Sequence, residues 1–398
     1  MLVDTAAGRP TLPQELIDLI LDRTDEQSLI ACARVARSFR HTSQKHIFAN
    51  VMLRPAFQYR RGWLRSKALT FKRFSQILSN SPHLAAHVHS LTLIEGTGLG
   101  SPKWMRKDAF PPLLSMLVNL TTISIGSDSL IDWDSFPPTL ITGLQATVGL
   151  PSLTSVRLHH LRFDRSAELA SFLQRCKNVE SLVFSQLAFK NSGDNNTGVL
   201  DTRTALSSLT MHPSLIPVIH SVTNTFDVRS LEYLHTTVSS PALETETQHL
   251  LDATENLAHC HVELDHHHTD SSIINLQALA CLRTLEITLF FELSTTPDGF
   301  DPVGWTGNIL ATSRDPSPIQ HVVLNINVEE QDISDLFRLK ELERFLVAPT
   351  MSSLRRLTVN LDSSDLDFDL YSCERDLSEA FPILSSRGML AIGLFGVS

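Results

Sequence analysis

The sequence of 398 residues contains no run of about 18 apolar residues, which is the length that a membrane-spanning helix requires. Its N-terminus also lacks a basic segment followed by an apolar one, so we expect no secretory signal. Cysteine is scarce: the five cysteines are odd in number and lie scattered between Cys32 and Cys373. These absences argue against a disulfide framework and favour a cytoplasmic or nuclear protein with free thiols and no contact with a membrane.

Motifs of the common catalytic and nucleotide-binding sites are absent as well. The sequence holds no GxxxxGK[ST] loop for phosphate, no dinucleotide-binding glycine motif, no HExxH and no GxSxG. Its 17 histidines and five cysteines show no spacing that selects a catalytic pair. We therefore expect no catalytic residues, no cofactor and no enzymatic activity.

Two short segments contain the residue types that bind metal ions. His259, Cys260 and His261 are followed by the histidines at 266–268, but successive side chains of a strand point to opposite faces, so Cys260 faces away from its two neighbours. The alternating aspartates at 365–369 resemble the start of a calcium loop, but a leucine and an aspartate stand where that loop needs glycine and glutamate. We expect no metal site.

The net charge of −10 is unevenly distributed along the chain. Residues 34–73 contain eleven lysines and arginines and no acidic residue, which leaves 22 basic and 43 acidic residues elsewhere. Aromatic residues, such as Trp63, lie between the basic ones. The stretch could bind nucleic acid, anchor one domain on the next, or steer the chain toward an acidic partner. Because the rest of the chain is acidic, we do not expect it to bind nucleic acid.

The segment 12–51 has the pattern of three short helices. Five of the six residues at 16–21 are apolar, which is more than the single stripe that a helix at the edge of a small bundle buries. Pro13 suits a helix start, and Thr24 to Gln27 has the pattern of a capping box in front of a second helix that carries Leu29. The excess apolar surface needs a cover, either from the rest of the chain or from a second protein.

The same segment resembles an F-box. The resemblance rests on Leu12-Pro13-x-Glu15-Leu16, on Ile20-Leu21, Leu29 and Val35, and on Ser38-Phe39-Arg40 and Ile47-Phe48-x-x-Val51. Phe39 stands where that family usually has tryptophan, and the turn at 22–25 lacks the usual leucine. The resemblance implies docking on the Skp adaptor of cullin-RING ubiquitin ligases. The docking residues that we expect are Leu12, Pro13, Leu16, Ile17, Ile20, Leu21, Leu29, Val35 and Phe39.

From about residue 85 a pattern recurs: apolar, two residues, apolar, one residue, apolar. Its middle residues are Leu91, Ile123, Val156, Leu182, Leu209, Leu234, Cys260, Leu285, Val322 and Leu357, with a weaker eleventh copy at 390–394. The middle residues of consecutive copies lie 25 to 27 residues apart in the central part of the chain and farther apart at both ends. Such spacing is typical of leucine-rich repeats with inserted helices. Each copy predicts a strand, and the segments 71–78, 167–176, 336–345 and 377–384 between strands have helical periodicity.

The repeats resemble a divergent leucine-rich-repeat family of about 10–11 units. We therefore predict an α/β fold in which a three-helix F-box precedes a right-handed α/β solenoid with a curved parallel sheet. Polar residues alternate with apolar ones along the strands, so one face of the sheet is expected to be wet and to bind a partner. An unrelated α/β domain with several parallel strands is the alternative.

The expected organisation is an F-box-like module at 1–53, a basic linker with a helix at 54–84 and the repeat domain at 85–398, with polar loops at 190–203, 294–317 and 362–376. The predicted function is that of a substrate-recognition adaptor. It would contact the Skp adaptor and, through it, cullin, and would hold a protein substrate that the sequence does not identify. The alternative is a stand-alone repeat scaffold in which the first helices form a cap.

Overall fold

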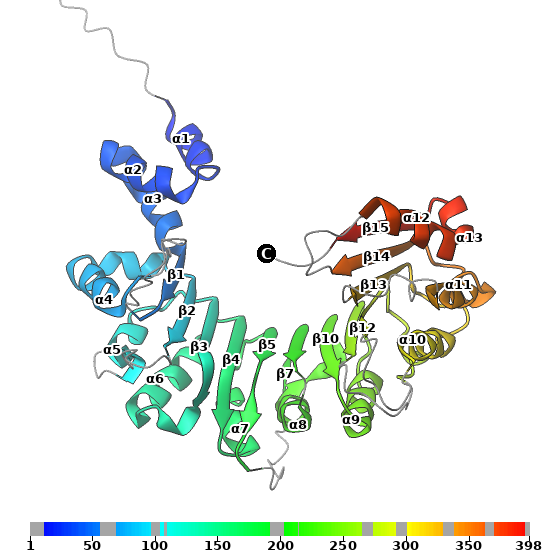
Figure 1. Ribbon diagram of the computed structural model, residues 1–398. Helices are drawn as coiled ribbons and strands as arrows, with labels where there is room; N and C mark the ends of the chain where they lie inside the picture. The colour runs from blue at the N-terminus through cyan, green and yellow to red at the C-terminus, as the bar shows by residue number, and fades with distance from the viewer. Residues whose placement is uncertain are drawn as a thin grey trace, which may run out of the picture. The chain divides into compact units, whose positions relative to one another are not determined.

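The computed structural model describes residues 12–55, 69–96, 104–106, 110–191, 203–213, 215–264, 274–291, 301–328, 338–362 and 370–394. Helices alternate with strands along almost the whole chain (Figure 1). Contacts divide the chain into two compact units. The first comprises Met1–Ser129 and Ser135–Thr154, and the second comprises Leu130–Asp134 and Ser155–Ser398.

The first unit begins with three helices and continues with parallel strands and further helices. Its elements are α1 (Gln14–Leu21), α2 (Glu26–Val35), α3 (Arg37–Ala49), β1 (Asn50–Leu53), α4 (Phe71–Asn80), η1 (Pro82–His87), β2 (Ser90–Glu95), η2 (Trp104–Arg106), α5 (Phe110–Ser115), β3 (Thr122–Asp132) and α6 (Pro138–Val148).

The three helices predicted at the N-terminus are present, with one difference at the start of α2. The capping residue is Asp25, whose carboxylate accepts hydrogen bonds from the backbone N–H groups of Gln27 and Ser28. Thr24, which the capping-box pattern had indicated, instead donates its hydroxyl to the carbonyl of Ile20 at the end of α1. Aspartate is as good an N-cap as threonine, so the pattern predicted the helix correctly but not the capping residue.

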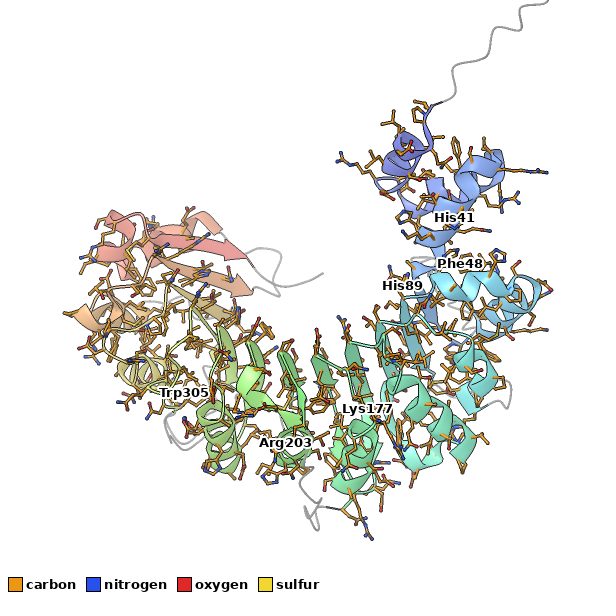
Figure 2. All side chains as sticks on the ribbon, turned by 180° about the vertical axis from the view of Figure 1, so that it is seen from behind. His41, Phe48, His89, Lys177, Arg203 and Trp305 are labelled. Atoms are coloured by element: carbon orange, nitrogen blue, oxygen red, sulfur yellow. The ribbon has the colours of Figure 1, made fainter. Side chains whose placement is uncertain are left out.

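Helix α3 leads directly into the sheet of the first unit. Ala49 ends the helix and Asn50 starts β1, which pairs in parallel with β2, so Val51 lies beside Leu91. The carbonyl of Ala49 also accepts a hydrogen bond from the N–H of His89, and Figure 2 shows His89 and Phe48 in this region. The sequence had not indicated β1, which lies inside the residues 1–53 expected for the helical module.

The core of the first unit includes an aromatic cluster. Phe71, the first residue of α4, has its ring centroid 5.8 Å from that of Trp104 and 5.6 Å from that of Phe110, and all three side chains are buried. Phe71 belongs to the basic and aromatic stretch 34–73, and here it anchors α4 on the elements that follow. Phe57, Tyr59 and Trp63 of the same stretch lie outside the described residues.

The second unit repeats strand and helix. Its elements are η3 (Trp133–Ser135, of which Ser135 belongs to the first unit), β4 (Ser155–Phe163), α7 (Ser166–Leu173), β5 (Ser181–Ser185), β6 (Ala188–Phe189), β7 (Thr204–Ala205), β8 (Ser208–His212), α8 (Ile216–Thr225), β9 (Phe226–Asp227), η4 (Val228–Ser230), β10 (Tyr233–Val238), α9 (Pro241–Asp252), β11 (His259–Leu264), β12 (Thr284–Phe291), α10 (Pro302–Ala311), β13 (His321–Val328), α11 (Lys340–Leu346), η6 (Pro349–Met351), β14 (Arg356–Asp362), α12 (Leu370–Ala380), α13 (Pro382–Ser386) and β15 (Leu390–Leu394).

The parallel strands predicted from the repeat are confirmed. In the second unit the strand order is β4, β5, β8, β10, β11, β12, β13, β14, β15, and neighbouring strands in this order pair in parallel. The middle residues of the repeat lie directly beside one another: Val156, Leu182, Leu209, Leu234, Cys260, Leu285, Val322, Leu357 and Leu390. This row forms the centre of the core, because helices α7 to α11 lie on the same side of the sheet (Figure 1).

The helices expected at 71–78, 167–176, 336–345 and 377–384 correspond to α4, α7, α11, and the pair α12 and α13. Two expected loops are wrong in part. Helix α10 occupies 302–311 of the segment 294–317, and α12 begins inside the segment 362–376. Residues 294–300 and 363–369 of these two segments lie outside the described residues. The same holds for residues 192–202 of the first expected loop.

Helix α10 was missed because its proline and glycines have the composition of a loop. Pro302 is the first helical residue, where its missing N–H costs nothing, and the carboxylate of Asp301 caps the helix by accepting from the N–H of Val303. Gly307 allows a close approach to α11, since a Cβ atom there would lie 2.6 Å from Cε2 of Phe345. Trp305 of the same helix is fully buried (Figure 2).

No helix within the described ranges has the length and apolar character needed to cross a membrane.

We predict that Gly307→Ala destabilises the protein, although alanine favours a helix over glycine by about 1 kcal/mol. The added methyl group must displace the ring of Phe345. Chemical denaturation of the full chain measures the effect, and the double variant Gly307→Ala, Phe345→Leu should lose less stability than the two single changes together. A gain in stability for Gly307→Ala alone would contradict the close packing of α10 on α11.

Candidate functional site

Helix α1 faces α3 with its polar side. Gln14, Asp18 and Asp22 follow one another at intervals of four residues and meet Ser38, Thr42 and His46, which have the same interval on α3. Thr42 donates its hydroxyl to Asp18 (2.6 Å), the amide of Gln14 donates to the carbonyl of Ser38 (3.2 Å), and Nε2 of His46 lies 2.7 Å from Oδ1 of Asp22. We call these six residues the polar ladder. Residues four apart share one face of a helix, so the ladder holds α1 along α3.

The hydrogen bonds of the ladder also fix its charge. The pKa of Asp18 lies below its usual value, first because the Thr42 hydroxyl donates to the carboxylate and second because the Gln14 amide does. Asp18 is therefore an acceptor at neutral pH, and its two donors stay paired with it.

The opposite side of α1 is apolar and exposed. Leu12, Leu16, Leu19 and Ile20 form what we call the outer apolar face, and Leu19 and Ile20 keep 57% and 58% of their surface accessible. Of the helix itself, Leu21 is the buried residue. Soluble helices normally bury their apolar residues, whereas α1 buries Leu21 and part of Ile17 and leaves its other three apolar residues exposed. Such a face marks a surface that another molecule covers.

The expected docking residues fall into three groups. Leu12, Pro13, Leu16, Ile20 and Val35 are exposed, Ile17 and Phe39 are half-buried, and Leu21 and Leu29 are buried. The two buried leucines support the three helices from within and do not reach the surface.

Sequence analysis missed two exposed apolar residues of this module, Leu19 on α1 and Ile30 on α2. For Leu19 a signal existed: residues 12, 16, 19 and 20 follow the i, i+4, i+7, i+8 spacing of one helical face. No comparable signal separates Ile30 from the buried Leu29 beside it.

A second candidate surface lies on the face of the second unit's sheet that points away from the helices. Six side chains gather there on β8, β10, β11 and β12, and we call them the His–Glu cluster: His212, His235, His259, His261, Glu263 and Glu286. Cys260, between two of the histidines, points into the core, as the alternation of the strand predicted. Burial raises the pKa of its thiol to about 12, so it is not a reactive nucleophile.

Hydrogen bonds connect the members of the cluster. Oε2 of Glu263 lies 2.8 Å from Nδ1 of His212 and accepts the hydroxyl of Thr237 at 3.2 Å. Oε2 of Glu286 lies 3.2 Å from Nε2 of His259, and its Oε1 accepts the amide of Asn325 at 2.6 Å.

The rings of His235 and His261 stack almost parallel, with centroids 3.9 Å apart. Nε2 of His261 also lies 2.8 Å from the hydroxyl of Thr288. The stack leaves both rings half-buried on the sheet.

The cluster keeps its glutamates charged and one histidine neutral. The hydrogen bond from His259 is the main reason why the pKa of Glu286 falls to about 2. Burial alone would raise the pKa of Glu263, but the imidazoles of His212 and His235 outweigh it and the value lies well below the usual range. Burial, and then the neighbouring His235, lower the pKa of His261 to about 4.

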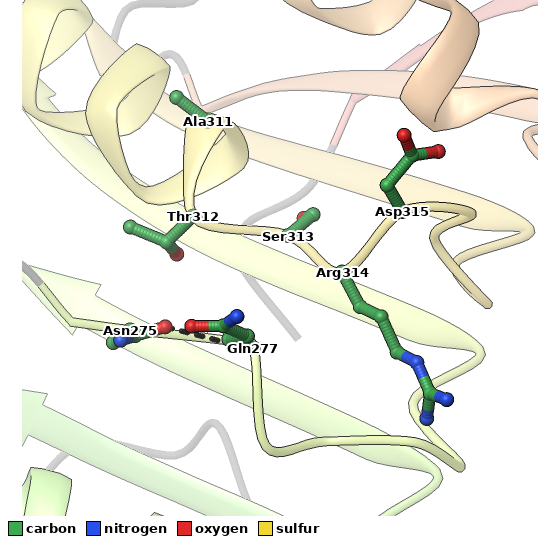
Figure 3. Close-up of a pocket in the computed structure, with 7 residues that line it drawn as sticks. All are labelled: Asn275, Gln277, Ala311, Thr312, Ser313, Arg314 and Asp315. Atoms are coloured by element: carbon green, nitrogen blue, oxygen red, sulfur yellow. Dashed lines mark hydrogen bonds between the residues drawn. The ribbon is translucent and has the colours of Figure 1, made fainter.

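A small polar pocket lies where the loop before β12 meets the end of α10 (Figure 3). Its lining residues are Asn275, Gln277, Ala311, Thr312, Ser313, Arg314 and Asp315. The Oδ1 of Asn275 accepts the N–H of Gln277, and the hydroxyl of Thr312 accepts the N–H of Leu276. These contacts hold the loop in place, and the lining offers neither an imidazole nor a thiol for acid–base or nucleophilic chemistry.

Metal ligation finds no geometric support in the part of the chain that the structure describes, because no three His, Cys, Asp or Glu side chains there are placed to hold an ion. The histidines at 266–268 and the aspartates at 365–369 lie outside the described residues.

We predict that the protein loses stability as the pH falls from about 6.5 to about 4. The unfolded chain binds a proton at His261 near the ordinary value of 6.5, whereas the folded chain binds it only near 4, so acid favours unfolding in this window. Denaturant titrations across this range measure the slope. His261→Asn should flatten it, while His249→Asn, at an exposed histidine of α9, should leave it unchanged. Equal slopes for both variants would contradict the burial argument.

The comparison with protein families gives one match, to the F-box domain, over residues 10–50. Comparison with curated proteins gives no match. The matched residues include α1, α2 and α3 and end at the first residue of β1, so they contain both the polar ladder and the outer apolar face. The three N-terminal helices thus match the F-box domain, which supports an F-box protein.

Proposed function

We propose that this protein is the substrate-recognition adaptor of an SCF-type ubiquitin ligase. Its F-box binds a Skp-type adaptor, which connects it to cullin, and its second unit holds a target protein. The observation that carries the proposal is the exposure of Leu16, Leu19 and Ile20 on the side of α1 that lies away from its hydrogen bonds to α3.

The outer apolar face gives the docking energy a physical source. Full burial of a leucine or isoleucine side chain stabilises a complex by roughly 1.5–3 kcal/mol. Leu16, Leu19 and Ile20 are all exposed in the free chain, so a partner that covers them gains this energy. Val35 at the end of α2 is more exposed still, at 77%, and adds a further apolar contact on the same module.

The adaptor carries out no bond chemistry itself. Its physical task is to hold a target lysine close to a ubiquitin-charged enzyme, which raises the effective concentration of the reacting groups.

The second unit is proposed to be a divergent leucine-rich-repeat domain. The support is the direct register of the middle repeat residues and the alternation of strand and helix at the predicted positions. In such a repeat the helices cover one face of the sheet, and the other face is left for a ligand.

The second candidate function is a stand-alone repeat scaffold in which the first helices form a cap. It draws support from α3, which continues into β1 and packs against η1. However, a cap should bury the apolar side of its helices, and α1 does not do so.

We predict that Leu16→Asp and Ile20→Asp each abolish capture of the chain by a purified Skp-type adaptor. Both positions are exposed, so the variants should fold normally, but each places a charge on the docking face. Val118→Asp changes an equally exposed apolar residue of the first unit outside the F-box match and should bind as the unmodified chain does. If the unmodified chain fails to bind, or Ile20→Asp binds equally well, the proposed docking surface is wrong.

A truncation separates the two functions. Removing the residues before Asp25 deletes α1, including the buried side chain of Leu21 and the polar contacts with α3, so an adaptor should lose roughly the 1.5–3 kcal/mol that burial of one leucine contributes. It should also lose adaptor binding. If the first helices form a cap, the truncated chain should lose several times more stability. Leu29→Asp, which places a charge at a buried site, is expected to cause a loss of that size. Calorimetric melting of the three chains gives the comparison.

A further inference from the structure

The proposed function leaves open what kind of target the second unit holds. The His–Glu cluster lies on the face of its sheet that the helices leave uncovered (Figure 1). Side chains on this face come from every second residue of each strand, and those of the cluster are imidazoles and carboxylates. The face therefore offers charge and hydrogen bonds, in contrast to the outer apolar face of α1.

Several aspartates of this unit pair with an arginine, and within the described residues the two glutamates of the cluster do not. Asp132 pairs with Arg162, Asp227 with Arg229 and Asp301 with Arg338. Glu263 and Glu286 contact imidazole, hydroxyl and amide groups, and in the described ranges neither pairs with a lysine or an arginine.

Both carboxylates are ionised at neutral pH and partly shielded from water, with 14% and 22% of their side chains accessible. The stacked His261 stays neutral, so it does not balance their charge. A cation that approaches this face meets two carboxylates that, among the described residues, contact only imidazoles, hydroxyls and an amide, in a medium less polar than water, where attraction between opposite charges is stronger than at an exposed surface.

We propose that this face binds an extended, cationic segment of the target protein, with two lysines or arginines separated by one residue. The glutamates occupy neighbouring strands, β11 and β12, and Glu263 lies beside Thr288, two positions beyond Glu286. Strands lie about 4.8 Å apart and two residues of a strand span about 6.6 Å, so the carboxylates are offset by about 8 Å. Alternate residues of an extended peptide are about 7 Å apart, which matches this offset.

The charge of the whole chain favours the same kind of partner. The net charge of −10 attracts a basic segment from a distance and repels an acidic one. The inference depends on the proposed function only in calling the bound segment a target. Binding of a cationic peptide and binding of the Skp-type adaptor use different units of the chain and can fail separately.

The experiment uses the full chain and fluorescent peptides in fluorescence anisotropy at near-physiological salt. One peptide alternates lysine with serine, a second carries the same lysines in one block, and a third alternates glutamate with serine. The first should bind more tightly than the block peptide, and the acidic peptide should not bind. The double variant Glu263→Gln, Glu286→Gln should weaken the first peptide about tenfold or more, which corresponds to about 1.4 kcal/mol.

The control removes the same charge elsewhere in the second unit. Glu180→Gln combined with Glu232→Gln, at two exposed positions, should keep the unmodified affinity. Adaptor capture and circular dichroism on the same samples confirm folding, and Glu286→Gln alone serves if the double variant does not fold. Equal binding of the basic and acidic peptides, or undiminished binding by the folded glutamine variants, would overturn the inference. Retained adaptor capture in that case would leave the proposed function intact.

Discussion

The orientation of α1 is the constraint on which the functional argument depends. Thr42 and His46 fix it from α3 by contacting Asp18 and Asp22, and each contact joins the same relative positions of the two helices. Individually such exposed contacts contribute little to stability. Their effect is directional: with Asp18 and Asp22 against α3, the helix turns Leu21 inward and leaves Leu16, Leu19 and Ile20 outside. The apolar exposure is thus a consequence of the ladder and not of loose packing.

The two-residue period of the strands divides the side chains of the second unit's sheet between two faces. On one face, neighbouring strands place buried side chains beside one another in a continuous row from Val156 to Leu357. The residues that alternate with them along each strand point to the other face and are not part of this row. A change on the face of the His–Glu cluster therefore leaves the core row intact. Polar residues such as Glu263 and His235 can occupy this face because their neighbours in register hydrogen-bond or stack with them.

Much of this architecture could be predicted from the sequence, since a period of apolar residues reports directly on which side chains a strand buries. The ten middle residues and the helices between them follow from it. Helix α10 was not predicted, because proline and glycine are typical of loops. The structure shows that Pro302 is the first helical residue and that Gly307 allows a close contact with Phe345. The outer apolar face was predicted as an excess of apolar residues. Which of these residues point outward could not be predicted, because apolar residues surround most of the helix and the orientation of α1 depends on its contacts with α3.

The junction between the F-box and the first sheet bears on how an adaptor of this kind works. Proximity raises a reaction rate only if the two groups are held in a defined arrangement, and a flexible connection spreads the target over a large volume. In the first unit the docking helices are not followed by such a connection: α3 ends at Ala49, β1 starts at Asn50, and the Ala49 carbonyl is itself bonded to the N–H of His89 before β2. A basic linker had been expected after residue 53, but β1 comes before it and fixes α3 to the sheet. Rigidity at this point follows from backbone hydrogen bonds rather than from side chains. The junction should therefore tolerate substitutions of exposed side chains on α3.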